Sequence, residues 1–173
     1  LLSGYEGSKK ILAASSYLIE KYLKGFDIYF LNYGEYDGRL FTGTFVSLAE
    51  EQEGGSASWA KDIKAYLENL TDDYIIFALD DYLLSQPINQ ELYQSIDLAG
   101  VDCVKLCSSA NLDKQYSCTT QYTIWRRDLL IEILGKVVTP WQFEDYGSPI
   151  LNGMFKTIIH IPVMTYPANS CLS

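Results

Sequence analysis

Residues 74–82 read YIIFALDDY, an almost wholly apolar run that stops at two aspartates. A strand that is apolar on both faces is typical of the middle of a parallel sheet, where helices cover both sides. In an open α/β sheet, ligands bind beyond the carboxyl ends of such strands. The stretch therefore predicts a central strand at residues 74–79 and a candidate site at Asp80 and Asp81.

Helical and extended patterns alternate along the rest of the chain. Apolar residues at helical spacing predict helices from Ser8 to Gly25, at 58–70, 89–98 and 127–134, and one that begins at Pro140. Short apolar runs predict strands at 1–2, 27–31, 41–48, 102–107, 119–125 and 156–164. This order predicts an α/β fold with a mixed, mostly parallel sheet flanked by helices.

The length of 173 residues suits one domain with a core of its own, and we expect a single domain over residues 1–173. Hydrophobic residues make up 48% and charged residues 20%, which is typical of a folded chain. The net charge of −9 makes unaided nucleic-acid binding unexpected, because phosphate contacts need a basic surface. No apolar run approaches the ~20 residues that span a bilayer. The start at Leu1, without a methionine, indicates a fragment or a processed product.

The four cysteines and the single histidine, His160, offer little for a metal site. Cys103 and Cys107 are four positions apart in an expected strand, which separates them by about 13 Å on one face. That separation is too long for a disulfide or for two ligands of one zinc ion. We therefore expect reduced thiols and a cytoplasmic protein. A position at the periphery of the inner membrane is compatible with this expectation.

Asp80 and Asp81 are adjacent carboxylates in an expected crevice, where like charges repel unless something compensates. A divalent cation such as Mg²⁺ or Mn²⁺ is the usual compensation, and such an ion commonly bridges to a substrate diphosphate. The plain alternative is a pair of solvated turn residues. Taken alone the pair favours that alternative, and Asp72-Asp73, at the other end of the strand, is an example of such a turn.

Residues 140–148 read PWQFEDYGS and carry a second acidic pair, Glu144 and Asp145. A carboxylate beside Trp141 and Phe143 is partly desolvated, which raises its proton affinity and makes it a better general base. The alternative is the first turn of a helix, where acidic residues match the helix dipole.

Residues 121–130 read QYTIWRRDLL and contain two neighbouring arginines. The pair, Arg126 and Arg127, would suit a phosphate clamp, or it would form ion pairs with Asp128 and Glu132 on a helix surface. For Arg127 the surface interpretation is favoured.

In this order, residues 74–83, 123–130 and 140–148 resemble stretches of a family of bacterial glycosyltransferases with the GT-A, nucleotide-diphospho-sugar transferase, type of fold. Trp59, which opens the helix before the acidic strand, fits the same pattern. The matching pieces lie within residues 59–148, a little over half of the chain. The resemblance implies a single GT-A-like domain whose cleft binds a nucleotide-sugar donor.

The resemblance also implies roles for particular residues. Ser3, Gly4 and Tyr5, after the first strand, would lie near the base and ribose of the donor. Asp80 and Asp81 match the acidic motif that would hold Mn²⁺ or Mg²⁺ on the diphosphate.

Glu144 and Asp145 match the acidic pair of the family, one member of which would deprotonate the acceptor hydroxyl in an inverting transfer. The implied reaction moves a sugar from a nucleoside diphosphate to a saccharide or lipid-linked acceptor, in cell-surface polysaccharide synthesis.

The acidic motif departs from the usual Asp-x-Asp, because here the two aspartates are adjacent. Neighbouring side chains in extended backbone point to opposite faces. One aspartate would then hold the metal while the other orders the turn, and Asp81 is favoured as the ligand.

Two other functions remain open at this point. A glycoside hydrolase also uses two carboxylates, although hydrolases with long clefts are usually larger. A non-catalytic carbohydrate-binding or assembly module fits the 14 tyrosines and the altered acidic motif.

Overall fold

The computed structural model describes residues 1–4, 9–33, 43–49, 58–88, 90–107, 116–154 and 157–164. Along these residues the order is β1 (Leu2–Gly4), α1 (Lys9–Tyr22), β2 (Tyr29–Tyr33), β3 (Thr44–Ala49), α2 (Trp59–Leu67), β4 (Tyr74–Leu79), α3 (Gln90–Ser95), β5 (Cys103–Cys107), β6 (Thr123–Arg126), α4 (Arg127–Leu134), α5 (Pro140–Asp145), α6 (Gly147–Gly153) and β7 (Ile158–Met164). The fold is therefore α/β, as the alternating pattern predicted.

The strands form one seven-stranded sheet in the order β3-β2-β1-β4-β6-β5-β7. Within this sheet β6 runs antiparallel to β4 and β5, and the other neighbouring strands pair in parallel. The residues that lead into β6 consequently lie at the edge where the parallel strands have their carboxyl ends. We call this the carboxyl edge of the sheet.

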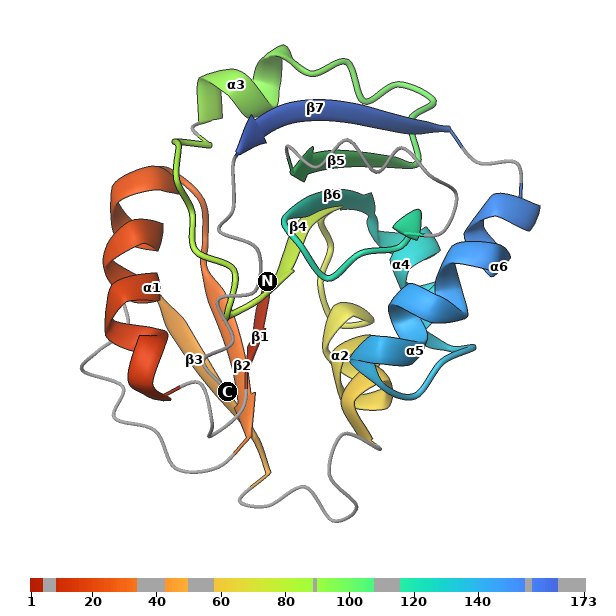
Figure 1. Ribbon diagram of the computed structural model, residues 1–173, viewed down its shortest axis with the longest axis horizontal. Coiled ribbons are helices and arrows are strands. Elements are labelled where there is room, and N and C mark those ends of the chain that lie inside the picture. Colours follow the sequence, from red (N-terminus) through yellow and green to blue (C-terminus); the bar gives the residue numbers. More distant parts are fainter. Residues whose placement is uncertain are drawn as a thin grey trace.

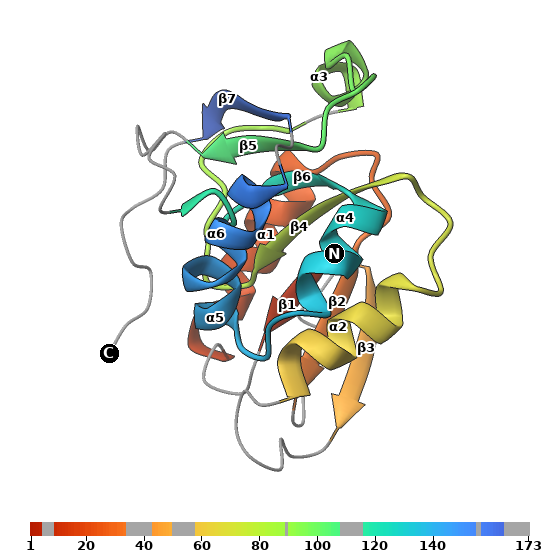
Figure 2. The ribbon, with the colours of Figure 1, turned by 90° about the vertical axis from the view of Figure 1, so that its right-hand side faces the viewer.

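Helices cover both faces of the sheet (Figure 1). On one face lies α1, and on the other lie α2, α4, α5 and α6, which Figure 2 shows in front of the sheet. Successive side chains of a strand point to opposite faces. Strand β4 therefore contributes Phe77 to the core under α2 and α4, and Ala78 to the core under α1. This confirms β4 as a central strand, covered on both sides.

Phe143 anchors α5 in the core on the α2 side, where it is fully buried. Its ring lies 6.0 Å from that of Trp59, 6.3 Å from Phe77 and 5.7 Å from Trp125, between ring centroids, in edge-on arrangements. Because such aromatic contacts stabilise beyond the area they bury, they hold α5 against the sheet next to the carboxyl edge.

Most expected elements are confirmed, and the differences have local causes. Strand β4 and helix α4 have the predicted bounds, whereas β6 begins at Thr123 instead of residue 119. Residues 119–122 form a turn instead, in which the N–H and the hydroxyl group of Thr120 donate to the Glu144 side chain. The helix expected from Pro140 is two short helices, α5 and α6, which meet at Tyr146.

Two of the cysteines, Cys103 and Cys118, are buried and carry free thiols, as expected. Burial raises the pKa of Cys103 to about 12 and raises that of Cys118 as well, so both thiols stay protonated at neutral pH. The side chain of Cys107, and Cys171, lie outside the described residues. No helix in the described ranges has both the length and the apolar character needed to cross a membrane.

Candidate active site

Asp80 follows β4 at the carboxyl edge and packs directly against the end of β1. Its backbone N–H donates to the carbonyl of Ser3 at 2.9 Å, and only 3% of the residue is exposed. A Cβ atom on Gly4 would lie 2.3 Å from Asp80 Oδ2 and 2.7 Å from Phe30 Cζ. Only glycine at position 4 leaves room for this carboxylate, so β1 and the acidic turn fit together as one unit.

The neighbouring Asp81 is half-buried and therefore more accessible than Asp80. Both aspartates lie in the turn that follows β4, not in the extended backbone assumed from the sequence, and within that turn their exposure differs. Asp80 is the more enclosed residue, whereas Asp81 is partly exposed, with one of its two carboxylate oxygens buried.

Ser3 supports this edge from inside the fold. Its hydroxyl accepts a hydrogen bond from Trp59 Nε1 at 3.1 Å, and the residue is 1% exposed. The Ser3 side chain thus ties β1 to α2, while direct contact with a ligand stays a prediction. Tyr5, the third residue expected here, lies outside the described residues.

Glu144, on α5, is held at the same edge by the turn that precedes β6. Its Oε1 atom accepts hydrogen bonds from Thr120 N at 2.8 Å, Thr120 Oγ1 at 2.8 Å and Thr119 Oγ1 at 3.3 Å. The carbonyl of Thr120 in turn accepts from the N–H of Leu79 at 2.9 Å. Leu79 is the residue before Asp80, so a single threonine joins the two acidic pairs that are more than sixty positions apart in sequence.

The acidic pair on α5 has one fixed and one exposed member. The three hydrogen bonds that described residues donate to the Glu144 carboxylate all go to Oε1, and Oε2 receives none from these residues. Asp145 is exposed. The two aromatic residues expected beside these carboxylates differ in burial: Phe143 enters the core, whereas Trp141 is 68% exposed. Desolvation of the carboxylates by Trp141 and Phe143 stays a prediction.

The two arginines lie at the opposite edge, so the phosphate-clamp interpretation is not supported. Arg126, which pairs with Tyr74 at the start of β4, bonds to the carboxylates of Asp128 and Asp102.

Arg127 donates to the carbonyl of Leu67, the last residue of α2, at 3.3 Å and to the carbonyl of Asp72, in the turn before β4, at 2.8 Å. The ion pairs expected for Arg127 on the helix surface have other partners, because Asp128 pairs with Arg126 and Glu132 pairs with Lys136 at 2.8 Å.

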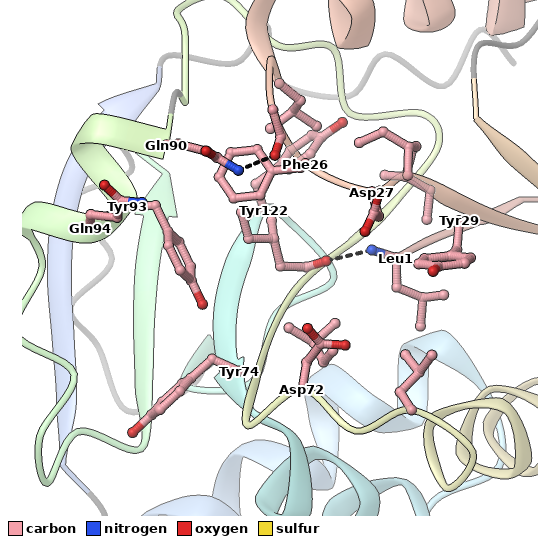
Figure 3. A pocket seen from close by; sticks show the side chains of 17 residues that line it. Leu1, Phe26, Asp27, Tyr29, Asp72, Tyr74, Gln90, Tyr93, Gln94 and Tyr122 are labelled. Atoms are coloured by element: carbon pink, nitrogen blue, oxygen red, sulfur yellow. Dashed lines mark hydrogen bonds between the residues drawn. The ribbon is translucent and has the colours of Figure 1, made fainter.

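A cavity of about 310 Å³ opens at this opposite edge (Figure 3). Leu2 is paired with Ala78, so four residues of β4, Tyr74 to Phe77, extend beyond the start of β1. The cavity occupies this gap between β2 and β4, where the Leu1 nitrogen donates to the carbonyl of Ile76 at 2.7 Å. Since β4 spans ~17 Å from end to end, the cavity is separate from Asp80 and Asp81, which follow the other end of the strand.

Thr119 and Thr120 are the residues that sequence reasoning missed. They fall in a stretch that read as the start of a strand, and their contacts depend on β6 running antiparallel to β4. Two consecutive threonines were the available signal, but hydroxyl residues also occur widely in ordinary turns.

Comparison with protein-family models and with curated proteins gave no match. Solved structures do resemble the chain. A mannosyltransferase of Pyrobaculum calidifontis, PcManGT, in complex with GDP-Man and Mn²⁺ is 15% identical, with a TM-score of 0.61 over 95% of this chain and 55% of its own. The glycosyltransferase GlyE of Streptococcus pneumoniae is 12% identical, with a TM-score of 0.56 over 92% of this chain and 44% of its own.

A cytidylyltransferase of Leptospira borgpetersenii is 13% identical, with a TM-score of 0.60 over 93% of this chain and 74% of its own. At such identities the likeness shows the fold: the chain has the GT-A-like α/β architecture that the sequence predicted. The chain spans about half the length of the two glycosyltransferases.

Gly4→Ala is expected to disturb the acidic turn. The new Cβ must displace the Asp80 carboxylate or the Phe30 ring, and neither has free space in this buried corner. We expect a loss of about 1–3 kcal/mol in the free energy of unfolding, measured by urea denaturation. Gly153→Ala is the control, because its Cβ would meet nothing within 4 Å. Equal stability of the two variants would contradict the packing described for Gly4 and Asp80.

Proposed function

We propose that the protein is a glycosyltransferase that moves a sugar from a nucleoside diphosphate to a saccharide or lipid-linked acceptor, in cell-surface polysaccharide synthesis. The observation that carries this proposal is the link from Leu79 through Thr120 to Glu144, which brings both acidic pairs to the carboxyl edge. Ligands of open α/β sheets bind at this edge. Sugar transfer needs both charge neutralisation at the leaving diphosphate and a base for the acceptor alcohol.

The first acidic pair is assigned to the donor. Asp81, the more exposed residue of the pair, would bind Mn²⁺ or Mg²⁺. Asp80, in the same turn, would support the metal site and lie beside the donor. In the described part of the chain no three metal-binding side chains cluster. Two carboxylates still fit a hard cation whose other ligands are diphosphate oxygens and water. The bound metal would neutralise charge on the leaving nucleotide.

The second acidic pair is assigned to the acceptor. Glu144 is positioned through Oε1 and presents Oε2 without a donor from the described residues, which suits a group that accepts a proton. Asp145, exposed on the next position of α5, is the other candidate. Ser3, Gly4 and Tyr5 are assigned to the base and ribose side of the donor.

The likeness to solved structures supports this proposal at the level of substrate class. Two of the similar proteins are glycosyltransferases, and one was solved with GDP-Man and Mn²⁺. Nucleotidyl transfer is the second candidate, because the cytidylyltransferase matches over a larger share of its own length. The two reactions differ in their products, since nucleotidyl transfer releases pyrophosphate and sugar transfer releases a nucleoside diphosphate.

Calorimetry with UDP-, GDP- and TDP-sugars, and with CTP, tests the substrate class. We expect one sugar nucleotide to bind, at least about tenfold more tightly with Mn²⁺ or Mg²⁺ than without, because the metal offsets repulsion between diphosphate and aspartates. Asp81→Asn should remove the increase in sugar-nucleotide affinity that the metal gives. The proposal fails if no sugar nucleotide gives heat or a thermal shift, and binding of CTP with pyrophosphate release would favour the second candidate.

Glu144→Gln and Asp145→Asn test the assignment of the base. Each change removes a carboxylate with little change in shape, and the amide introduced by Glu144→Gln keeps an oxygen that accepts from Thr120. In one of the two variants, expected to be Glu144→Gln, transfer should fall by about 10²–10⁴-fold while the donor Kd stays within about twofold. Unaltered rates in both variants would remove the proposed base. Release of free sugar from oligosaccharides without any nucleotide would instead indicate a hydrolase.

A further inference from the structure

Trp141 is a large apolar side chain on the surface, beside the acidic pair of α5. Of the three tryptophans in the chain, Trp59 and Trp125 are buried at 3% and 0% exposure, whereas Trp141 is 68% exposed. Leaving an indole in water forgoes the stabilisation that burial gives the other two. An exposed indole next to a candidate site is therefore a candidate contact for a ligand.

The helix that carries Trp141 is held firmly at its start. The Thr139 hydroxyl accepts from the N–H of Gln142 at 3.1 Å, and Gln142 Oε1 accepts from the N–H of Val138 at 2.9 Å. The Val138 carbonyl accepts from the N–H of Ala60, on α2, at 3.1 Å. Together with the buried Phe143 ring, these contacts fix the backbone on which the exposed indole stands. A ligand on Trp141 would thus meet a largely pre-organised surface.

Trp141 shares a helix face with both carboxylates, because residues three and four positions apart are neighbours on a helix. Glu144 is at i+3 and Asp145 at i+4. Along the helix axis the backbone positions of these residues lie about one turn, or about 5.4 Å, from Trp141, and this rise is close to the width of a pyranose ring. The face therefore combines a flat apolar surface with hydrogen-bond acceptors one sugar ring away.

A neutral saccharide fits this combination better than a nucleotide does. The C–H face of a pyranose packs on an aromatic ring, while its hydroxyl groups donate to carboxylates. A base would also stack on the indole, but its phosphates would then approach Glu144 and Asp145 and be repelled. The net charge of −9 also disfavours an anionic nucleotide relative to a neutral saccharide.

We infer that Trp141 is the stacking platform for the acceptor sugar: the pyranose ring packs on the indole and directs a hydroxyl toward Glu144 or Asp145. This inference rests on the proposed function and narrows it, because it identifies the acceptor-binding group as a neutral sugar ring. Trp141 is a binding residue in this account, and the proton is taken up by a carboxylate of α5.

Intrinsic fluorescence tests the inference without any turnover. Iodide should quench Trp141 and spare the two buried tryptophans, and Trp141→Phe should remove the quenchable component. The probes are the methyl glycosides of glucose, galactose, N-acetylglucosamine and rhamnose, each up to ~100 mM, because single sugars bind weakly. We expect at least one of them to shield Trp141 from iodide. The inference is overturned if none does, or if only the sugar nucleotide shields it.

Variants and the donor titration separate this inference from the proposed function. Trp141→Ala should weaken glycoside binding at least about tenfold with no change in donor Kd, and Trp141→Phe should restore part of it, because the flat ring returns. Tyr17→Ala is the control, because Tyr17 is also exposed, at 62%, but lies on α1. Shielding by a glycoside in a protein that binds no sugar nucleotide would support the sugar platform and refute transfer. Donor binding without shielding would refute the platform alone.

Discussion

The hydrogen bonds of Thr120 are the interaction on which the candidate site depends. Its N–H and hydroxyl donate to Glu144, and its carbonyl accepts from Leu79, the last residue of β4. Thr120 therefore accepts a hydrogen bond from the last backbone N–H of β4 and also positions the Glu144 carboxylate of α5. The antiparallel course of β6 makes this possible, because it returns the chain to the carboxyl edge immediately before the strand begins. Phe143 already holds α5 against the sheet, and the turn adds the contacts that fix the Glu144 carboxylate relative to the end of β4.

Neighbouring side chains at this edge differ in burial, since some pack in the core and others face the surface. On α5, Phe143 supplies the apolar contacts that hold the helix, and this leaves Trp141 and the carboxylates on the outer face. On the other side, the absence of a side chain at Gly4 lets the Asp80 carboxylate sit between strands. The candidate site therefore lies at the border of the core. Gly4 makes room for the Asp80 carboxylate and Thr120 binds the Glu144 carboxylate.

The sequence predicted what depends on local pattern. The apolar run of β4 and its abrupt acidic end identified a central strand and a position at the carboxyl edge, and the helical spacing of residues 127–134 gave α4 its bounds. Contacts between distant segments were not readable in this way. The pairing of Thr120 with Glu144 depends on strand direction, and the outward position of Trp141 depends on which face of a short helix meets the sheet. The cavity between β2 and β4 depends on strand register, which a single sequence does not specify.

Paramagnetic broadening by Mn²⁺ tests most directly whether the two acidic pairs form one site. Amide signals of the ¹⁵N-labelled protein would be recorded with Mn²⁺ and the sugar nucleotide that binds. The account predicts the strongest broadening at Asp80 and Asp81, with strong broadening also at Thr120 and Glu144. Signals of Asp72, Tyr74 and Tyr93, around the cavity at the opposite edge, should be affected least. Broadening centred on that cavity, or affecting Asp80 without Glu144, would contradict the account.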